Sequence, residues 1–137
     1  MKIKAISLWQ PWASLIALGE KKFETRSWPT NYRGLLAIHA ARRWTKVQQN
    51  LLRTTPFTQA LGWYTDEGDP PLGCIVAVAE LTDCFLTEQV SVNGNEYAFG
   101  DWAPGRFAWC LENVRRLPVP VPWKGRQGFF DVELELP

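Results

Sequence analysis

"SLWQPWASLIALGEKKFETRSWPTNYRGLLAIHAA", residues 7–41, carries a helix signal, a turn signal and two strand signals in direct succession. Pro11 suits the first position of a helix, and Gly19 suits the position just past a helix end. Apolar residues between them recur at helical spacing, namely Trp12, Leu15, Ile16 and Leu18. This pattern predicts a short helix within residues 10–19.

The period of the sequence changes to two directly after Gly19. One set of residues (Phe23, Thr25, Ser27) alternates with a second set (Lys22, Glu24, Arg26, Trp28), which predicts a strand. Glu24 and Arg26 then share one face of that strand. Lys21 lies an odd number of residues from Glu24, so a bend or bulge is needed to bring its side chain to the same face. A tight turn at Gly19 would aim Lys21 inward.

The rest of the chain is rich in strand signals. We expect strands over 3–8, 34–41, 73–86 and 106–117, and an edge strand, a glycine-bounded loop and a final strand within 119–136. Residues 44–62 are typical of a helix, 64–71 of a loop and 93–105 of a long irregular connection. The sequence therefore predicts an α+β fold, a small β-barrel with flanking helices, formed by a single domain over residues 1–137.

Charge is unevenly distributed along the chain. Residues 1–54 hold ten Lys and Arg against two acidic residues, whereas residues 55–137 hold five basic and twelve acidic residues. A basic face concentrates anions such as phosphates, unless folding interleaves the two halves. The sequence therefore leaves two alternatives: a basic face that binds an anionic partner, or a surface on which the two kinds of charge are mixed.

Cysteine and histidine usage argues against a metal centre and a disulfide framework. The three cysteines are widely spaced, with no CxxC pair, and the chain has a single histidine. They are typical of buried thiols in a reducing compartment, so we expect a cytoplasmic protein without a metal or cofactor. No apolar run approaches the roughly 20 residues of a membrane helix, and we expect no membrane partner.

The charged strand allows three interpretations. Glu24 and Arg26 can simply form a surface ion pair of small net value. Alternatively, Trp28 on the same face stacks a base while the neighbouring cations hold its phosphate. A lysine surrounded by cations such as Lys22 and Arg26 can also become a base or nucleophile, although Glu24 acts in the opposite direction.

Residues 7–41 closely resemble the start of an ASCH domain, the activating-signal-cointegrator homology domain related to the PUA fold. The hallmark G-x-K-x-x-E-x-R is met by Gly19, Lys21, Glu24 and Arg26. The Q-P-W-A, R-S-W and R-G elements are similar to the cointegrator-type branch. Later segments that are similar to the family's other strands are "GCIVAVAELTDCF", "RFAWCLENVRRL" and "VPWKGRQGFFDV". The resemblance implies a PUA-like barrel with a cleft, lined by the motif side chains, that binds RNA or another nucleic acid.

Some relatives implied by this resemblance are enzymes. They include small amidohydrolases that act on acetylated cytidine and a metal-dependent ribonuclease. The amidohydrolases use the motif lysine, matched here by Lys21, a threonine where this chain has Glu24, and a late glutamate. Thr25 is adjacent to the replaced position, and either Glu96 or Asp101 could supply the late carboxylate.

Three functions follow as hypotheses. The first is a nucleic-acid-binding module, with RNA as the leading ligand, or a site for a free nucleotide or nucleoside. The second is a hydrolase of a modified nucleoside or of RNA, with Lys21, Glu24 and a late carboxylate as its catalytic groups. The third is a protein-interaction domain. The predicted ligand-binding residues are Lys21, Glu24, Arg26, Trp28, Tyr32, Arg33, Arg42 and Arg43.

Further features have competing interpretations. We expect His39 to be a hydrogen-bonded structural histidine, because it shares a face with small and apolar residues. The segment "WKGRQG", 123–128, either forms an ordinary hairpin turn or cradles a phosphate with its backbone N–H groups. Of the eight tryptophans, we expect Trp9 and Trp109 to pack in the core or at the barrel end and Trp28 to stack on a ligand.

Overall fold

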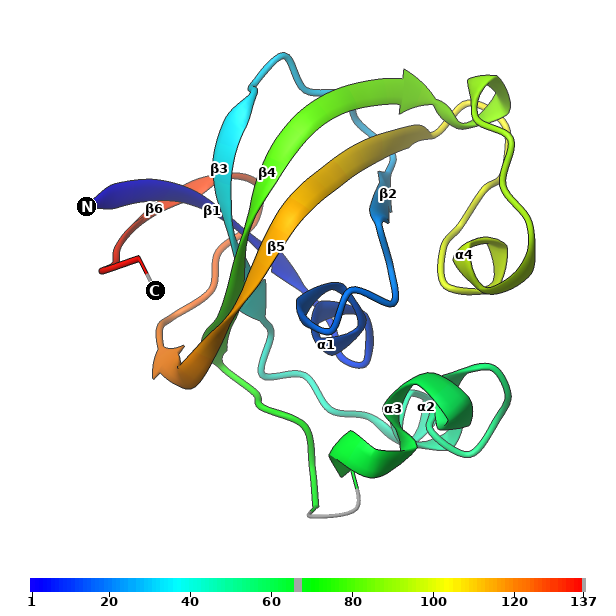
Figure 1. The fold of residues 1–137 in the computed structure, drawn as a ribbon, viewed down its shortest axis with the longest axis horizontal. Coiled ribbons are helices and arrows are strands. Elements are labelled where there is room, and N and C mark those ends of the chain that lie inside the picture. The colour runs from blue at the N-terminus through cyan, green and yellow to red at the C-terminus, as the bar shows by residue number, and fades with distance from the viewer. Residues whose placement is uncertain (66–67, 137) are drawn as a thin grey trace.

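A computed structural model describes residues 1–65 and 68–136 of the chain (Figure 1). It contains six strands: β1 (Lys2–Leu8), β2 (Phe23–Arg26), β3 (Gly34–Ala40), β4 (Cys74–Leu86), β5 (Phe107–Pro122) and β6 (Phe130–Glu133). The helices are α1 (Trp12–Ala17), α2 (Lys46–Leu51), α3 (Phe57–Thr65) and α4 (Gly94–Ala98), with a 3₁₀ turn η1 (Thr87–Gln89).

The six strands form one strongly curved sheet in the order β2-β5-β4-β3-β1-β6 (Figure 1). β1 pairs with β3 in parallel, and every other neighbouring pair is antiparallel. Within the described residues the end strands β2 and β6 do not pair, so the sheet is an open barrel. The predicted α+β, barrel-like fold with flanking helices is therefore confirmed, without closure of the sheet.

Strand alternation divides the core between the two faces of the sheet. On β1 and β3, Ile6, Leu36 and Ile38 belong to a cluster that packs against α1, whereas Ala5 and Ala37 belong to a second cluster with β6. Each set follows the period of two that places successive side chains on opposite faces. Both faces of these central strands are thus buried over most of their length.

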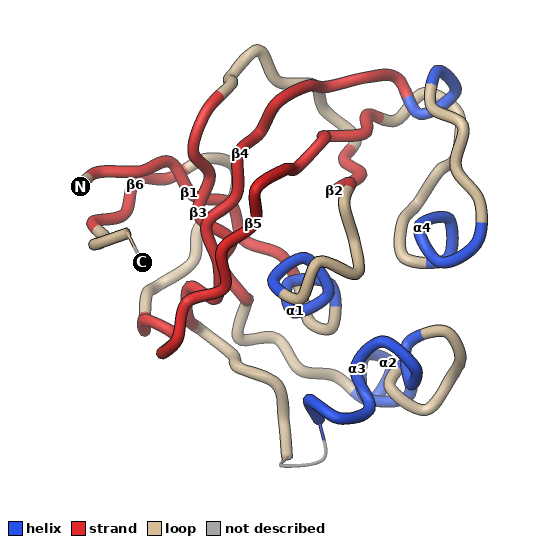
Figure 2. The backbone as a smooth tube through the Cα atoms, viewed as in Figure 1, coloured by secondary structure: helices blue, strands red, loops and turns tan. Residues whose placement is uncertain are grey.

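The helices gather on the side of the sheet that lies away from both chain termini (Figure 2). Leu15 of α1 is fully buried and joins Phe57, Leu61 and Phe99 in a third apolar cluster, which anchors α3 and the end of α4 to α1. Gly19 has φ +77 just after α1, which is the turn expected there. This turn carries the chain directly into the charged strand β2.

Three expectations differ from the structure. The helix expected over 44–62 is two helices, and the irregular connection over 93–105 contains α4. β5 also runs unbroken through Pro118, Pro120 and Pro122, because β2 pairs only with its first residues, Phe107–Cys110. The prolines lie where β5 is an edge strand, the position in a sheet that tolerates a missing N–H. Residues 66 and 67 of the expected loop lie outside the described residues.

Candidate nucleic-acid interface

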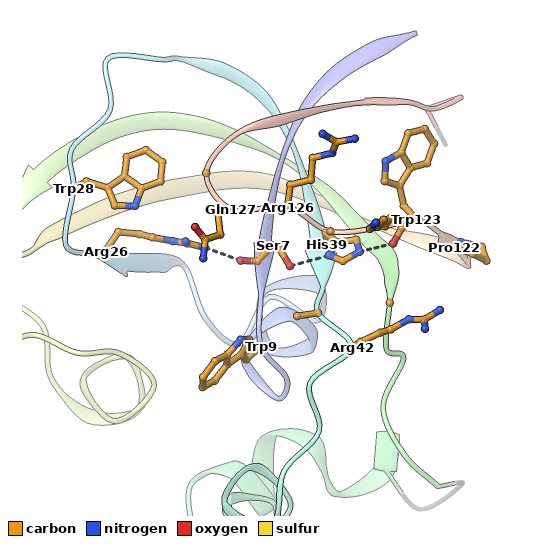
Figure 3. Close-up of a pocket in the computed structure, with 15 residues that line it drawn as sticks. Ser7, Trp9, Arg26, Trp28, His39, Arg42, Pro122, Trp123, Arg126 and Gln127 are labelled. Atoms are coloured by element: carbon orange, nitrogen blue, oxygen red, sulfur yellow. Dashed lines mark hydrogen bonds between the residues drawn. The ribbon is translucent and has the colours of Figure 1, made fainter.

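A groove crosses the edge of the sheet where β1, β2 and β3 approach the loop after β5. It consists of two adjoining hollows of about 1150 and 580 Å³. Four residues line both hollows and therefore join them: Ser7, Trp9, Arg26 and Trp28. Figure 3 shows the larger hollow, with Trp28 and Arg26 from the β2 region and Trp123 and Arg126 from the loop after β5.

The larger hollow is aromatic and basic. Its lining includes three indole rings, those of Trp9, Trp28 and Trp123, and four cations, those of Arg26, Arg42, Lys124 and Arg126. None of the described residues that line it is acidic. The cations of such a surface attract an anionic ligand, and its indole rings offer flat apolar faces on which an aromatic ring of that ligand can stack.

Arg26 is fixed at the junction of the two hollows by two partners. Its Nε donates to Glu24 Oε2 over 3.1 Å, and its Nη2 donates to the carbonyl oxygen of Ser7 over 2.8 Å. Both side chains of the ion pair are about four-fifths buried or more. The pair therefore differs from a solvated surface pair, because it holds the guanidinium in one orientation before any ligand arrives.

Lys21 points inward, as the turn after α1 predicts, but it is buried. Its side chain is 1% exposed, and Nζ has no hydrogen-bond partner among the described residues. Burial lowers the pKa of this amine, and the nearby carboxylates of Glu24 and Glu96 oppose that effect. Lys21 is not among the residues that line the groove, so its amine lies behind the groove wall.

Trp28 is held by other aromatic rings. Its ring meets that of Trp109 edge to face at 4.7 Å between centroids, and it meets Phe129 in the same manner at 5.6 Å. The indole N–H of Trp109 also donates to the carbonyl oxygen of Trp28. The ring of Trp28 is therefore preoriented at the groove and stabilises the core beneath it.

Ser7, His39 and the loop after β5 form a hydrogen-bonded series (Figure 3). His39 Nδ1 lies 2.8 Å from Ser7 Oγ, and Nε2 lies 2.7 Å from the carbonyl oxygen of Trp123. A carbonyl oxygen only accepts, so Nε2 carries the hydrogen. When the ring is neutral, Nδ1 accepts from the hydroxyl of Ser7. His39 is thus the hydrogen-bonded histidine expected, and it also lines the larger hollow.

Gly125 brings the loop into contact with this pair. A Cβ at position 125 would lie 2.7 Å from Cε1 of His39 and 3.2 Å from Oγ of Ser7. The backbone can approach the imidazole this closely because glycine has no side chain. The "WKGRQG" segment therefore closes over the histidine, and its cations lie along the larger hollow.

The smaller hollow carries mixed charge. Its lining includes Glu24, Thr25, Asp101 and Arg106. The hydroxyl of Thr25 accepts the backbone N–H of Asp101, and Arg106 pairs with the carboxylate of Asp101 at 3.4 Å. The carboxylate of Glu96 accepts the backbone N–H of Lys22 at 2.7 Å, which fixes the start of β2.

The pH dependence of stability follows from His39. Burial lowers its pKa from 6.5, so between the lowered value and 6.5 the unfolded chain binds more protons than the folded chain. The contribution of His39 to the free energy of unfolding is therefore full above pH 6.5 and is lost as the pH falls toward the lowered pKa. Urea denaturation between pH 7.5 and 5 should show this loss, and His39→Gln should flatten it. An unchanged slope in His39→Gln would assign the loss to other groups.

Comparison with known proteins shows to which family the chain belongs. The sequence model of the ASCH domain matches residues 6–120, most of the chain. The chain belongs to the ASCH family. This is a PUA-like fold that is generally implicated in RNA binding. The chain is also 27% identical over 132 residues to human activating signal cointegrator 1 and 26% identical to the mouse protein. Those matches cover 96% of this chain and 22% of each relative, so the chain spans about a fifth of their length.

Solved ASCH structures from Zymomonas mobilis share the fold at low sequence identity. The wild-type structure is 14% identical, with a TM-score of 0.57, over 95% of this chain and 87% of that one. The structure of a point mutant of the same bacterial protein is 16% identical, with a TM-score of 0.55, over 97% and 91% of the two chains. These likenesses support the architecture of the ASCH domain described above.

Four of the eight predicted ligand-binding residues are absent from the groove lining, namely Lys21, Tyr32, Arg33 and Arg43. The hydroxyl of Tyr32 donates to the carbonyl oxygen of Leu35, and its ring packs against Phe129. Arg33 donates to the carbonyl oxygens of Thr30 and Tyr32 and approaches Asp83. Neither is among the described residues that line the groove, because the 29–33 segment binds its own backbone. Arg42 lines the larger hollow, and Arg43 stacks over the ring of Trp9 at 4.9 Å.

Sequence reasoning missed part of the groove lining. Trp9 was expected to pack in the core or at the barrel end, yet it is 50% exposed and lines both hollows, whereas Trp109 is fully buried as expected. Ser7, Trp123, Lys124 and Arg126 also line the groove and are not among the predicted ligand-binding residues, although a phosphate cradle is one of the two interpretations of the 123–128 segment. The glycines that flank cations in 123–128 were the available signal for Lys124 and Arg126.

Among the described residues, no group of three or more His, Cys, Asp or Glu side chains is placed to hold a metal ion. None of the described helices is long and apolar enough to cross a membrane. The three cysteines are free thiols, of which Cys74 is buried and the other two are partly buried.

Proposed function

We propose that this domain binds single-stranded RNA, or a related nucleic acid, in the groove between β2 and the loop after β5. The observation that carries the proposal is the lining of the larger hollow, where three indole rings lie among four cations with no acidic neighbour among the described residues. Single-stranded nucleic acid is recognised by this pairing of stacking platforms with backbone-tracking charge. Membership of the ASCH family supports the same assignment.

The groove residues divide by role. Arg42 and Arg126 are exposed cations on opposite sides of the hollow and would contact phosphates. Trp9 and Trp28 would stack on bases. Arg26, already oriented by Glu24, would contact a phosphate or a base oxygen in a fixed geometry.

We expect Arg42→Ala/Arg126→Ala to weaken binding of a labelled single-stranded RNA by about tenfold for each arginine, because each removes a charge-assisted contact. The slope of log affinity against log salt should fall by about 0.7 for each lost phosphate contact to a single strand. Fluorescence anisotropy over a salt series, with duplex RNA and duplex DNA in parallel, measures both quantities.

The matched control is Arg115→Ala/Arg116→Ala, which removes the same charge from exposed positions of β5 outside the groove lining. If the groove is the binding site, the control variant should bind the RNA more tightly than Arg42→Ala/Arg126→Ala does. Equal losses of RNA affinity in the two variants would show that binding depends on the overall charge of the protein and not on the groove. Absence of binding to every polymer at low salt would overturn nucleic-acid binding and leave an acidic protein partner as the occupant to test.

A second candidate function is hydrolysis of a modified nucleoside, and Lys21 is the observation that favours it. The amine has no hydrogen-bond partner among the described residues and burial lowers its pKa, which is one way in which a lysine is activated as a base or nucleophile. Glu24 and Glu96 are the carboxylates that act on it electrostatically. Turnover of N-acetylated cytidine, followed by chromatography in wild type and Lys21→Met, tests this function. Equal product in both proteins would contradict a role for the amine.

A further inference from the structure

We propose that Ser7 is an acyl-accepting nucleophile activated by His39, so that the larger hollow hydrolyses a carboxylic ester. The hydroxyl and Nδ1 are 2.8 Å apart, which is within the distance needed for direct proton transfer. The two residues are register partners on the parallel strands β1 and β3, so the backbone fixes their separation. The nucleophile Ser7, its base His39 and the carbonyl oxygen of Trp123, which orients the base, are hydrogen-bonded in series, the arrangement that activates a nucleophile in covalent catalysis.

The tautomer of His39 suits this role. The carbonyl oxygen of Trp123 requires a hydrogen on Nε2, so Nδ1 of the neutral ring presents its lone pair to Ser7. The same carbonyl stabilises the imidazolium that forms when Nδ1 takes the proton. Burial favours the neutral ring in the resting state, since it lowers the pKa of His39.

Ser7 opens onto the groove, whereas His39 is 1% exposed and lies behind it, against the loop after β5. Ser7 is partly exposed and lines both hollows, and His39 lines the larger one. Arg26 donates to the backbone oxygen of Ser7, so its guanidinium lies beside the reacting centre (Figure 3). Its N–H groups beyond those bound to Glu24 and Ser7 can stabilise the oxyanion of a tetrahedral intermediate.

The reaction balances without a cofactor. Oγ of Ser7 bonds to the acyl carbon while its proton passes to Nδ1 of His39. The bond from the acyl carbon to the alcohol oxygen then breaks, and the alcohol leaves with the proton from Nδ1. Water attacks the acyl-enzyme and gives its proton to Nδ1. Ser7 leaves with that proton and the carboxylic acid is released.

The groove lining indicates the substrate class. Indole rings and cations around Ser7 suit an ester whose alcohol part is a nucleotide, with a stackable base and an anionic phosphate. This choice of alcohol rests on the proposed nucleic-acid function, whereas the chemistry at Ser7 does not. The first test therefore uses probes that carry no nucleotide, so that failure of one proposal is distinguishable from failure of the other.

The experiment is labelling of the whole protein with a fluorophosphonate, followed by intact mass and peptide mapping, together with hydrolysis of p-nitrophenyl acetate. We expect one adduct, on Ser7, formed as its oxygen displaces fluoride. Ser7→Ala should abolish the adduct, and His39→Gln should slow it by about 100-fold or more, the range of general-base catalysis. Ser91→Ala, at an exposed serine outside the groove lining, should label as wild type does.

Melting curves of each variant accompany the labelling, because His39 also ties the loop to the sheet. Failure of His39→Gln to fold leaves the mapping of wild type against Ser7→Ala as the deciding result. No adduct on Ser7 in folded wild-type protein would overturn the proposal and make the pair a structural clasp. Labelling of Ser7 at an unchanged rate in folded His39→Gln would overturn activation by the histidine.

Discussion

Replacing Lys21 with Met is expected to raise the free energy of unfolding at pH 7 by about 2 kcal/mol, because it removes a buried polar group that lacks a partner among the described residues. Met has a similar unbranched shape and no polar N–H group, so it can fill the same space. The melting temperature of this chain should rise by roughly 5–10 °C. Thermal and urea denaturation of the two proteins measure the change.

The pH profile gives this prediction a second readout. Burial lowers the pKa of Lys21 from 10.5, so between the lowered value and 10.5 the unfolded chain binds the additional proton. The contribution of Lys21 to stability is therefore full above pH 10.5 and is lost as the pH falls toward the lowered pKa. Lys21→Met should lack this dependence.

The control is Lys22→Met, one residue away and exposed, which should change the free energy of unfolding by no more than about 0.5 kcal/mol. A less stable Lys21→Met would contradict the prediction and show that Glu24 or Glu96 compensates the amine in solution. A more stable variant that also loses function would identify Lys21 as a residue kept for its chemistry at a cost in stability.

The strands could be predicted where burial on both faces leaves a continuous apolar pattern. β4 matches the expected 73–86 almost residue for residue, since the apolar run "CIVAVA", rich in β-branched valine and isoleucine, is typical of a strand buried in a sheet. The edge strand expected from residue 119 is present, but its unbroken continuation from the strand expected over 106–117 could not be predicted. A proline is compatible with an edge strand, and the sequence does not state that β2 is too short to cover that edge.

The site could be predicted only where its residues are close in sequence. The ion pair of Glu24 and Arg26 follows from a spacing of two on a strand. The contact of His39 with the carbonyl of Trp123 spans 84 residues, and no local pattern encodes it. The long-range pairing of β1 with β3 and the return of the loop after β5 decide which side chains line the groove.

Trp28→Ala should destabilise the fold by about 3 kcal/mol, and Trp9→Ala should leave stability nearly unchanged. Trp28 contacts both Trp109 and Phe129, so its removal leaves a cavity beside a fully buried ring. Trp9 is 50% exposed and loses little packing on truncation. Urea denaturation of the two variants measures the difference.

Trp9→Ala should weaken RNA binding without the loss of stability expected for Trp28→Ala. If Trp9 stacks on a base, Trp9→Ala loses about 1–3 kcal/mol of affinity while the protein remains fully folded. This makes Trp9 the cleaner probe of the groove, although Trp28 lies just past the strand of the family motif. Trp28→Phe retains a ring against Trp109 and supplies the matched variant for that position. Unchanged RNA affinity in folded Trp9→Ala would remove this ring from the binding surface and confine stacking to Trp28 and Trp123.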